Sequence, residues 1–482
     1  MRIDISWYQP KKSVLSISSV EQLMGLASIV TSNGDVIPYD SFLGKTIVLT
    51  SDIDLSSIGD EWRAIGSRER PFEGTFDGNK FKLEGLKTSN ALAYNGIFGA
   101  TTENACIHDL IVKAEFYEAQ TIGGIVAING GNITSCKFYG TAMGYHAVGG
   151  LVGMNTGVIL RSSNHANIVS KNQYAGGLVG VNQNDIGEIS DSYNIGKVSG
   201  INCVGGITGH NSGTQIKNCF NKGEVVTFEG YANSVCFGGI TGYNNAGCPI
   251  KNCFNSATIK GGKFTGGLVG KNLGVLEGCF NEGNIQGAKS VGGISGGNFN
   301  GQFETCRNKG TVAGKSMVGG ISGESQGGFI HNCINSTSVD GEQGLVGGIL
   351  GYSKWGQVTN SSNDGVIRSL NDEKCGGILG EISFGKVRNC SNTGAIVGSA
   401  KVGGIVGSCV NRSTIDSCSN TGDIRGNSIV GGLMGYAYGD IKDSYNTGTV
   451  YGFDSFSNIV ALNESGSIKD CYSTGRMVNI SL

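Results

Sequence analysis

Short alternations of apolar and polar residues recur along most of this chain. In the stretch 415–424, IDSCSNTGDI, apolar side chains stand at Ile415, Cys418 and Ile424, with polar residues or glycine between them. Runs of this kind, bounded by Gly and Asn, predict short β-strands with one buried face. Within these runs no apolar stretch is long enough for an amphipathic helix. The pattern therefore predicts an all-β fold for most of the chain.

The alternations belong to an internal repeat that is marked by a Gly-Gly pair. The spacings between successive pairs run from 26 to 33 residues. With a degenerate copy at each end, Asn95–Gly99 and Asn458–Ala461, the chain holds about 14 units of about 28 residues. The pairs begin at Gly123, Gly149, Gly176, Gly205, Gly238, Gly266, Gly292, Gly319, Gly347, Gly376, Gly403 and Gly431.

Each unit has the composition of one coil of a β-solenoid. Three short strands separated by Gly or Asn turns would close one coil, and equivalent strands of successive coils would stack into parallel sheets. The expected fold is therefore a parallel β-helix of about 14 coils.

Two positions of the unit predict inward-facing ladders. One position holds cysteine in nine units and serine at Ser162, Ser192, Ser361 and Ser444, so it favours a small side chain. In-register residues of neighbouring strands lie about 4.8 Å apart, which would stack these thiols and hydroxyls. Two residues later stands Asn, whose amide can bond to the copies above and below. The Gly that follows, such as Gly310, suits a positive φ or a tight corner. The ladder cysteines are Cys136, Cys219, Cys253, Cys279, Cys306, Cys333, Cys390, Cys418 and Cys471, and the ladder asparagines include Asn221, Asn281, Asn308 and Asn420.

The first 94 residues lack the regular repeat. Ser19 and Gln22 make a capping box, and apolar residues at helical spacing follow it, which predicts a short helix that stops by Gly34. Strands are predicted at Thr46–Thr50 and Phe72–Leu86. Because an exposed solenoid end is an open sheet edge, we interpret this helix as a cap. We divide the chain into residues 1–94, an N-terminal cap with the first irregular coils, and residues 95–482, the repeat β-helix.

The units resemble a known repeat family. Gly266–Gly287, GGLVGKNLGVLEGCFNEGNIQG, is similar to the GLUG repeat of bacterial surface and secreted proteins, which include adhesin-like proteins and the N-terminal regions of some IgA-specific metallopeptidases. The leader Lys45–Leu86 resembles the segment that commonly precedes such repeats. The resemblance covers nearly the whole chain and implies a right-handed parallel β-helix displayed outside a bacterial cell. It identifies a scaffold, and a scaffold does not fix a function.

Composition narrows the class of partners. The 83 glycines are accompanied by only 4 prolines, which excludes collagen and a disordered Pro/Gly tract. A net charge of −2 offers no basic field for nucleic acid. No apolar run approaches the length of a bilayer span, and residues 1–12 lack the apolar core of a signal peptide. Either the protein stays in the cytoplasm, or the secreted or cell-surface location that the resemblance implies requires a leader outside this sequence.

Candidate catalytic chemistry is sparse. A zincin needs His-Glu-x-x-His, and none of the five histidines is followed by Glu, so this sequence holds no such site. The acids that precede the Cys position, Asp191, Asp443 and Asp470, are replaced by Asn in most units, which indicates an outward polar position without a dedicated site. We expect no cofactor, because the acidic residues of the leader lack the fixed spacing of a calcium site. These residues are Asp52, Asp54, Asp60 and Glu61.

Aromatic residues supply the candidate ligand contacts. Tyr352 and Trp355, in GYSKWGQ, lie in a unit loop where a flat ring could stack on a sugar, and Tyr145 and His146 are further candidates. The alternative for Trp355 is that it covers an apolar edge of its coil.

We expect an adhesin-like protein that binds a glycan or a host surface protein, since no residue demands catalysis. One alternative is a β-helical polysaccharide lyase or glycoside hydrolase, which would carry acids, Lys or Arg, and aromatics over adjacent coils. The other is a non-catalytic spacer of a larger secreted peptidase.

Overall fold

The structure, a computed structural model, describes residues 3–89, 93–183, 186–228, 234–369, 371 and 374–480. It divides into two compact units: unit 1 comprises residues 1–231 and 240–242, and unit 2 comprises residues 232–239 and 243–482. The chain is all-β, a parallel β-solenoid of about 16 turns, and among the described residues α1 (Val20–Thr31) is its one α-helix. The expected fold class is therefore confirmed, with slightly more turns than the repeat count of about 14.

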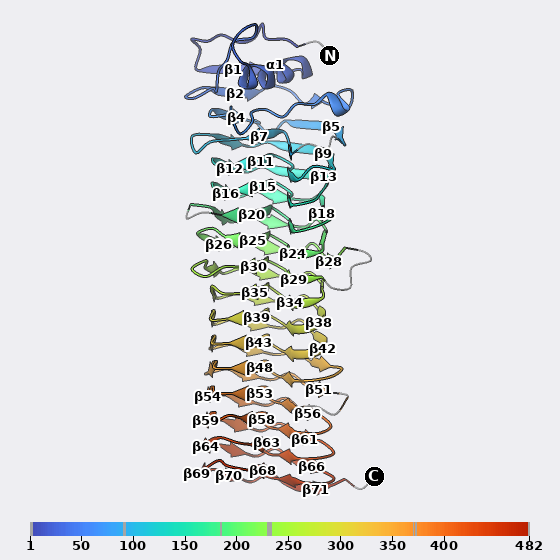
Figure 1. Cartoon of the computed structure of the whole chain (residues 1–482), viewed down its shortest axis with the longest axis vertical. Helices are drawn as coiled ribbons and strands as arrows, with labels where there is room; N and C mark the ends of the chain where they lie inside the picture. Colours follow the sequence, from blue (N-terminus) through green and yellow to red (C-terminus); the bar gives the residue numbers. More distant parts are fainter. Residues whose placement is uncertain are drawn as a thin grey trace. The chain divides into compact units, whose positions relative to one another are not determined.

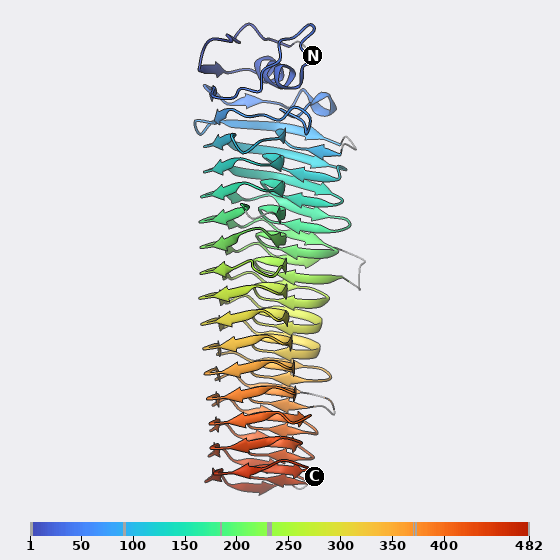
Figure 2. The same cartoon turned by 60° about the vertical axis from the view of Figure 1, so that its left-hand side comes forward.

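One coil of unit 2 shows how a repeat folds (Figure 2). It runs through β40 (Gln302–Glu304) of sheet A, β41 (Arg307–Asn308) and β42 (Val312–Gly319) of sheet B, and β43 (Ser322–Gln326) of sheet C. Each strand pairs in parallel with its equivalent in the next coil. The coil has one strand more than the three predicted, because the Asn turn divides the part that lies in sheet B.

The additional turns come from the leader. In unit 1, β1 (Val14–Ile17), β2 (Thr46–Leu49), β4 (Thr75–Asp77) and β8 (Cys106–His108) pair in parallel within sheet A. Coils therefore form before the first Gly-Gly pair, where a count of glycines does not register them. The division at residue 94 stays a prediction.

Helix α1 lies beside β1 and β2 in unit 1 (Figure 1). Its N-cap is Ser19, whose hydroxyl accepts a hydrogen bond from the backbone N–H of Gln22 at 3.4 Å, and the Gln22 side chain in turn accepts from the N–H of Ser18. Leu23, Leu26 and Ile29 are buried. The helix ends at Thr31, before the predicted stop at Gly34. Its apolar side thus packs within unit 1, as the amphipathic pattern requires.

Two stacked rows of small and polar side chains fill part of the interior. Eight of the nine ladder cysteines are at most 1% exposed, and Cys471 is half-buried. Asn281 donates through Nδ2 to Asn308 Oδ1 at 2.8 Å and to the Gly283 carbonyl at 2.9 Å. Each such amide therefore forms hydrogen bonds within its own turn and to the next coil, so its burial leaves no polar group without a partner. The same bonds join Asn164, Asn194 and Asn221 in unit 1 and run from Asn255 to Asn446 in unit 2.

A second asparagine row lies in sheet C. In unit 1, Asn129, Asn155, Asn182 and Asn211 are linked by amide bonds of 2.8–2.9 Å. In unit 2 the row runs through Asn244, Asn272 and Asn298 and then changes to Ser325 and Ser353, whose buried hydroxyls have no hydrogen-bond partner. The sequence analysis missed this row, although its signal is an Asn six residues after the first glycine of a pair.

The acids and amides that precede the Cys position stand at a corner of each coil. Asp191, Asn332 and Asp443 have φ values of 49–52°, in the left-handed region. Asn and Asp tolerate that region better than other residues with a side chain, so the alternation of the two residue types reflects backbone geometry. Of the two roles expected for the Gly after the ladder Asn, Gly310 has the tight corner and not the positive φ. Glycine is required there because a Cβ atom would lie 1.9 Å from the Gly283 carbonyl oxygen of the preceding coil.

Candidate functional site

Three neighbouring coils of unit 2 place six candidate contact residues on sheet C or directly after its strands. The strands are β43, β48 (Leu350–Lys354) and β53 (Leu379–Ser383), paired in parallel and in register. Register places Tyr352 between Glu324 and Glu381, and Lys354 beside Ser383. Trp355 and Phe384 follow directly after β48 and β53. We call this set the three-coil patch: Glu324, Tyr352, Lys354, Trp355, Glu381 and Phe384.

Trp355 and Phe384 stand at a corner that normally takes Asn or Gly. The equivalent positions of neighbouring coils hold Asn300, Gly327 and Asn411, and all five residues have φ between 54° and 68°. A bulky side chain in the left-handed region costs about 1–2 kcal/mol of backbone energy. The two aromatic residues therefore occupy positions that their backbone conformation disfavours.

The two rings face solvent. The side chain of Trp355 is 57% exposed and that of Phe384 is 52% exposed, and the rings are stacked with their centroids 6.5 Å apart. The Lys354 ammonium lies 4.1 Å from the Trp355 ring centroid, a cation–π contact. Trp355 thus does not cover an apolar edge of its coil, which was the alternative interpretation from the sequence. The pair offers a flat apolar surface with a cation beside it.

The carboxylates of the patch are largely covered. Glu324 is 8% exposed, and its Oε2 accepts a hydrogen bond from the Ser290 hydroxyl at 3.1 Å. Glu381 forms an ion pair with Lys374. Burial, together with the charges of Glu381 and Glu324, raises the pKa of Tyr352 above its usual value, so its phenol stays protonated and can donate at neutral pH.

In unit 1 the other two sequence candidates belong to a different kind of cluster. The Tyr145 hydroxyl donates to Glu118, which also receives Lys171 at 2.6 Å, and the Lys171 ammonium lies 5.2 Å from the Tyr145 ring. The rings of His146 and Tyr174 meet edge to face at 5.5 Å, and Tyr174 stacks on His210 at 5.4 Å. We call Glu118, Tyr145, His146, Lys171, Tyr174 and His210 the Tyr145 cluster.

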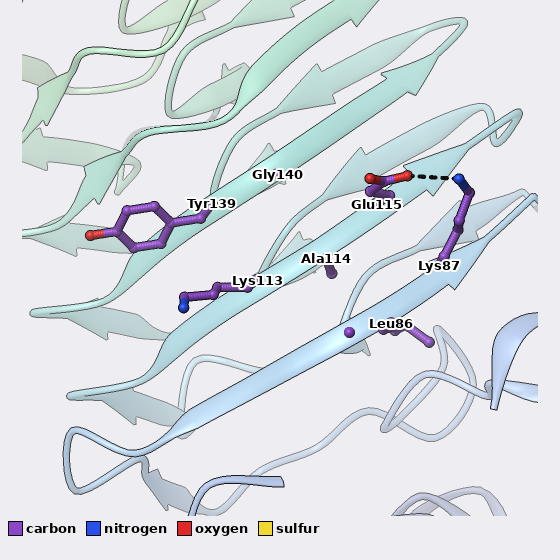
Figure 3. A pocket seen from close by; sticks show the side chains of 8 residues that line it. Leu86, Lys87, Lys113, Ala114, Glu115, Tyr139 and Gly140 are labelled. Atoms are coloured by element: carbon purple, nitrogen blue, oxygen red, sulfur yellow. Dashed lines mark ion pairs between the residues drawn. The ribbon is translucent and has the colours of Figure 1, made fainter. Parts of the chain in front are cut away.

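A shallow groove of about 380 Å³ lies on sheet B of unit 1 (Figure 3). It forms beside Gly85, where the pairing of β5 (Lys82–Thr88) with β9 (Ile111–Tyr117) shifts register, and beside Gly140 of β13 (Lys137–Gly144). Figure 3 shows Lys113 and Tyr139 at one end and the Lys87–Glu115 ion pair, 3.1 Å long, at the other. That pair neutralises its own charges, Lys113 is likewise paired with Glu84 at 3.3 Å, and the Tyr139 ring stacks on His165 with their centroids 4.4 Å apart.

The remaining candidate chemistry is occupied by structural contacts. Asp52, Asp54 and Asp60 each accept a backbone N–H, from Lys82, Ser56 and Ser89 respectively. Burial raises the pKa of the Cys136 thiol to about 12, so this ladder residue stays protonated and unreactive at neutral pH.

Tyr352 and Trp355 stand out in the sequence as aromatic residues of one unit, whereas Phe384, Lys354 and the two glutamates do not. A signal for Phe384 exists, since Phe384 and Trp355 each stand eight residues after the first glycine of their pair, Gly376 and Gly347.

Comparison with known proteins identifies the repeat. Residues 171–199, 200–227 and 426–451 match the family model described as the GLUG motif. Among curated proteins no relative matches the chain. A solved structure of a candidate immunoglobulin A1 protease from Bacteroides ovatus is 18% identical over 80% of this chain and 77% of that chain, with a TM-score of 0.20. At that TM-score the two backbones do not superpose as wholes, so this likeness assigns no activity. In the described part of the chain, no helix has both the length and the apolar character needed to span a bilayer.

Proposed function

This chain is a GLUG-repeat protein, and from that premise we propose that it is an adhesin-like protein of the bacterial surface or the secreted fraction that binds a glycan through the three-coil patch. Its repeats fit a surface or secreted β-helix. The observation that carries the binding role is the pair Trp355 and Phe384, whose rings stay exposed at corners where their backbone conformation is disfavoured.

An aromatic residue at this corner costs backbone energy that Asn or Gly would not. Neighbouring coils close the same corner with Asn300, Gly327 or Asn411, so folding does not require an aromatic residue there. Side chains held in disfavoured conformations concentrate at ligand-binding sites, where the strain is offset by function. Two aromatic residues on adjacent coils are therefore best explained by a ligand.

The chemistry of the patch favours a sugar. A flat aromatic surface can stack on the apolar face of a pyranose ring, while Lys354 and the Tyr352 hydroxyl can donate hydrogen bonds to its hydroxyl groups. Glu381, already paired with Lys374, adds acceptors at the same surface. One coil spacing of about 4.8 Å is close to the length of one sugar unit, so a chain of sugars could lie across successive coils.

The test is a glycan-array screen of the whole chain beside two variants. The first variant is Trp355→Ala combined with Phe384→Ala. The matched control is Phe329→Ala, which removes a ring that is 45% exposed on β44 (Phe329–His331) at an ordinary φ. Binding that survives in the control and disappears in the double variant supports the proposal. Binding that persists in the double variant, or a wild-type chain that binds no glycan, contradicts it.

A second candidate function is hydrolysis of the bound glycan. Glu324 and Glu381 flank Tyr352 two coils apart, a separation of about 9.6 Å between their strands, near the upper end of the range for inverting glycosidases. Product analysis by mass spectrometry on every bound glycan tests this candidate. Turnover that is abolished by Glu324→Gln would replace the adhesin role with an enzymatic one, and binding without products would exclude it.

A further inference from the structure

A second cluster of polar side chains lies in unit 1, on sheet A. Strands β4 and β8 pair in parallel and place Asp77 directly beside His108. Asp109 follows His108 and has a φ of 51°, which turns the chain at the corner. His108 Nδ1 lies 2.9 Å from Asp109 Oδ2 and 3.5 Å from Asp77 Oδ1. One ligand atom of each residue lies within 4.8 Å of the other two.

These separations are close to the distances between neighbouring ligand atoms around a bound metal ion. Zinc binds imidazole nitrogen and carboxylate oxygen at about 2.0–2.2 Å, which places neighbouring ligand atoms about 3.0–3.5 Å apart in tetrahedral or octahedral geometry. Both measured distances lie close to that range. In the metal-free state a single Nδ1 proton can lie between the two carboxylates, whereas a divalent cation would bind both of them and the nitrogen.

We propose that Asp77, His108 and Asp109 form a binding site for a divalent transition metal of the zinc type. One imidazole and two carboxylates are ligands that such ions prefer over the oxygen-only sets of calcium and magnesium. The three side chains are 28–39% exposed, so water can reach the site and complete the shell. Binding would replace the proton on Nδ1 and needs no movement of the backbone.

Cys106 is a candidate fourth ligand. It lies two residues before His108 on β8, on the same face of the strand, and is half-buried.

The consequence of binding is local to unit 1. Asp77 belongs to a leader strand, and His108 to the next coil of sheet A, so a shared ion would tie the two coils together. An ion that binds only the folded state stabilises it by RT ln(1 + c/Kd), where c is the free ion concentration, so the melting temperature rises with c. The site does not depend on the glycan proposal, because the three-coil patch belongs to unit 2.

Calorimetric titration of the chelator-treated whole chain with Zn²⁺ tests the site. We expect one ion per chain, and affinity at least about ten-fold weaker in Asp77→Asn, His108→Gln and Asp109→Asn. Asp109→Asn is the mildest change, because Asn tolerates the left-handed conformation at this corner. The matched control is His331→Gln, since His331 lies 4.0 Å from one carboxylate, Glu304, and contacts the Thr359 hydroxyl.

Further measurements separate a real site from a loss of folding. Melting curves without metal should coincide for the wild type and Asp109→Asn, and the rise in melting temperature with Zn²⁺ should be confined to the wild type and His331→Gln. Substitution with Co²⁺ reports the ligands directly, and loss of the thiolate charge-transfer band in Cys106→Ser would identify Cys106 as a ligand. Unchanged Zn²⁺ affinity in His108→Gln and Asp109→Asn, or an equal loss in His331→Gln, would overturn the proposal.

Discussion

The Tyr145 cluster of unit 1 and the three-coil patch of unit 2 use similar residues in opposite ways. In the cluster, Tyr145 and Lys171 both bind Glu118, and Tyr174 packs between two histidine rings. In the patch, Trp355 and Phe384 contact each other and a lysine but leave more than half of their surface in solvent. Rings whose partners lie within the protein contribute to stability, whereas exposed rings on a disfavoured backbone remain available to a ligand.

The difference also concerns the backbone. Neither Tyr145 nor Tyr174 has a positive φ, while Trp355 and Phe384 do. Aromatic residues of the cluster therefore cost nothing in backbone energy and gain ring contacts. The comparison predicts that mutations in the cluster change stability, and that mutations in the patch change binding with little effect on stability.

The largest effect is expected when the interior of unit 2 is overpacked. Cys306 is fully buried in the cysteine ladder of unit 2. Cys306→Leu should destabilise the protein by about 3 kcal/mol, because the added carbon atoms have no space, and should abolish patch binding through unfolding. Cys306→Ser should be mild, since Ser361 and Ser444 occupy the same position. Thermal melting checks both variants, and equal melting temperatures would contradict an inward-facing ladder.

Tyr174→Ala should be the next largest change. It removes the ring that contacts both His146 and His210, and we expect a loss of about 2 kcal/mol of stability. Glycan binding by the patch should be unchanged in the folded variant. Chemical denaturation measures the loss, and a value under about 0.5 kcal/mol would show that the cluster does not stabilise unit 1.

Trp355→Asn should separate binding from stability. The variant loses the ring contacts with Lys354 and Phe384 but gains a residue that tolerates the left-handed corner, so its stability should stay within about 1 kcal/mol of the wild type. Its glycan affinity should fall about ten-fold, because one stacked ring is worth about 1.4 kcal/mol. Parallel melting and binding curves check both values, and a large loss of stability with intact binding would reverse the assigned roles.

The smallest effect expected is a pH dependence to which the cluster contributes through His210, beside the partly buried His165, whose pKa is also lowered by burial. Burial lowers the pKa of His210 below its usual value of about 6.5, so the unfolded chain takes up a proton more readily than the folded one. Stability should therefore be full above pH 6.5 and fall as the pH drops below it. Glu118, whose pKa is lowered by the hydrogen bonds from Lys171 and Tyr145, loses its contribution only below its unfolded pKa, near 4.5.

The control for this pH dependence is His210→Gln. Melting temperatures measured between pH 7.5 and 5.5 should decline in the wild type and be flatter in the variant. A decline of equal slope in both would assign the effect to another group.

Sequence patterns predicted the fold because every coil repeats the same physical requirement. A small side chain at the Cys position and an Asn two residues later recur in unit after unit, so every unit predicts the same coil. The leader coils escaped the count because their strands lack the glycine pair. The second asparagine row escaped notice because Ser325 and Ser353 interrupt it.

The candidate site was only partly predictable for a different reason. Tyr352 and Trp355 stood out as aromatic residues in one unit, but Glu324 and Glu381 belong to other units and reach Tyr352 only through the register between coils. Exposure and the sign of φ decide whether a ring is structural or available, and neither can be read from residue type. From the sequence, Trp355 is interpreted either as a cover of an apolar edge of its coil or as a ligand contact, and residue type does not distinguish the two.

The asparagine ladder makes the number of coils adjustable. Each Asn donates to the next copy and accepts from the previous one, so Asn281, Asn308 and Asn335 present the same two bonds to their neighbours. If one whole coil were deleted, the Asn of the coil before it and the Asn of the coil after it could form the same hydrogen bond. Unequal recombination between repeats in a gene of this kind can therefore lengthen or shorten the protein by whole coils. Such variation in copy number would change the position of the ligand-binding coil in the stack and leave its side chains unchanged.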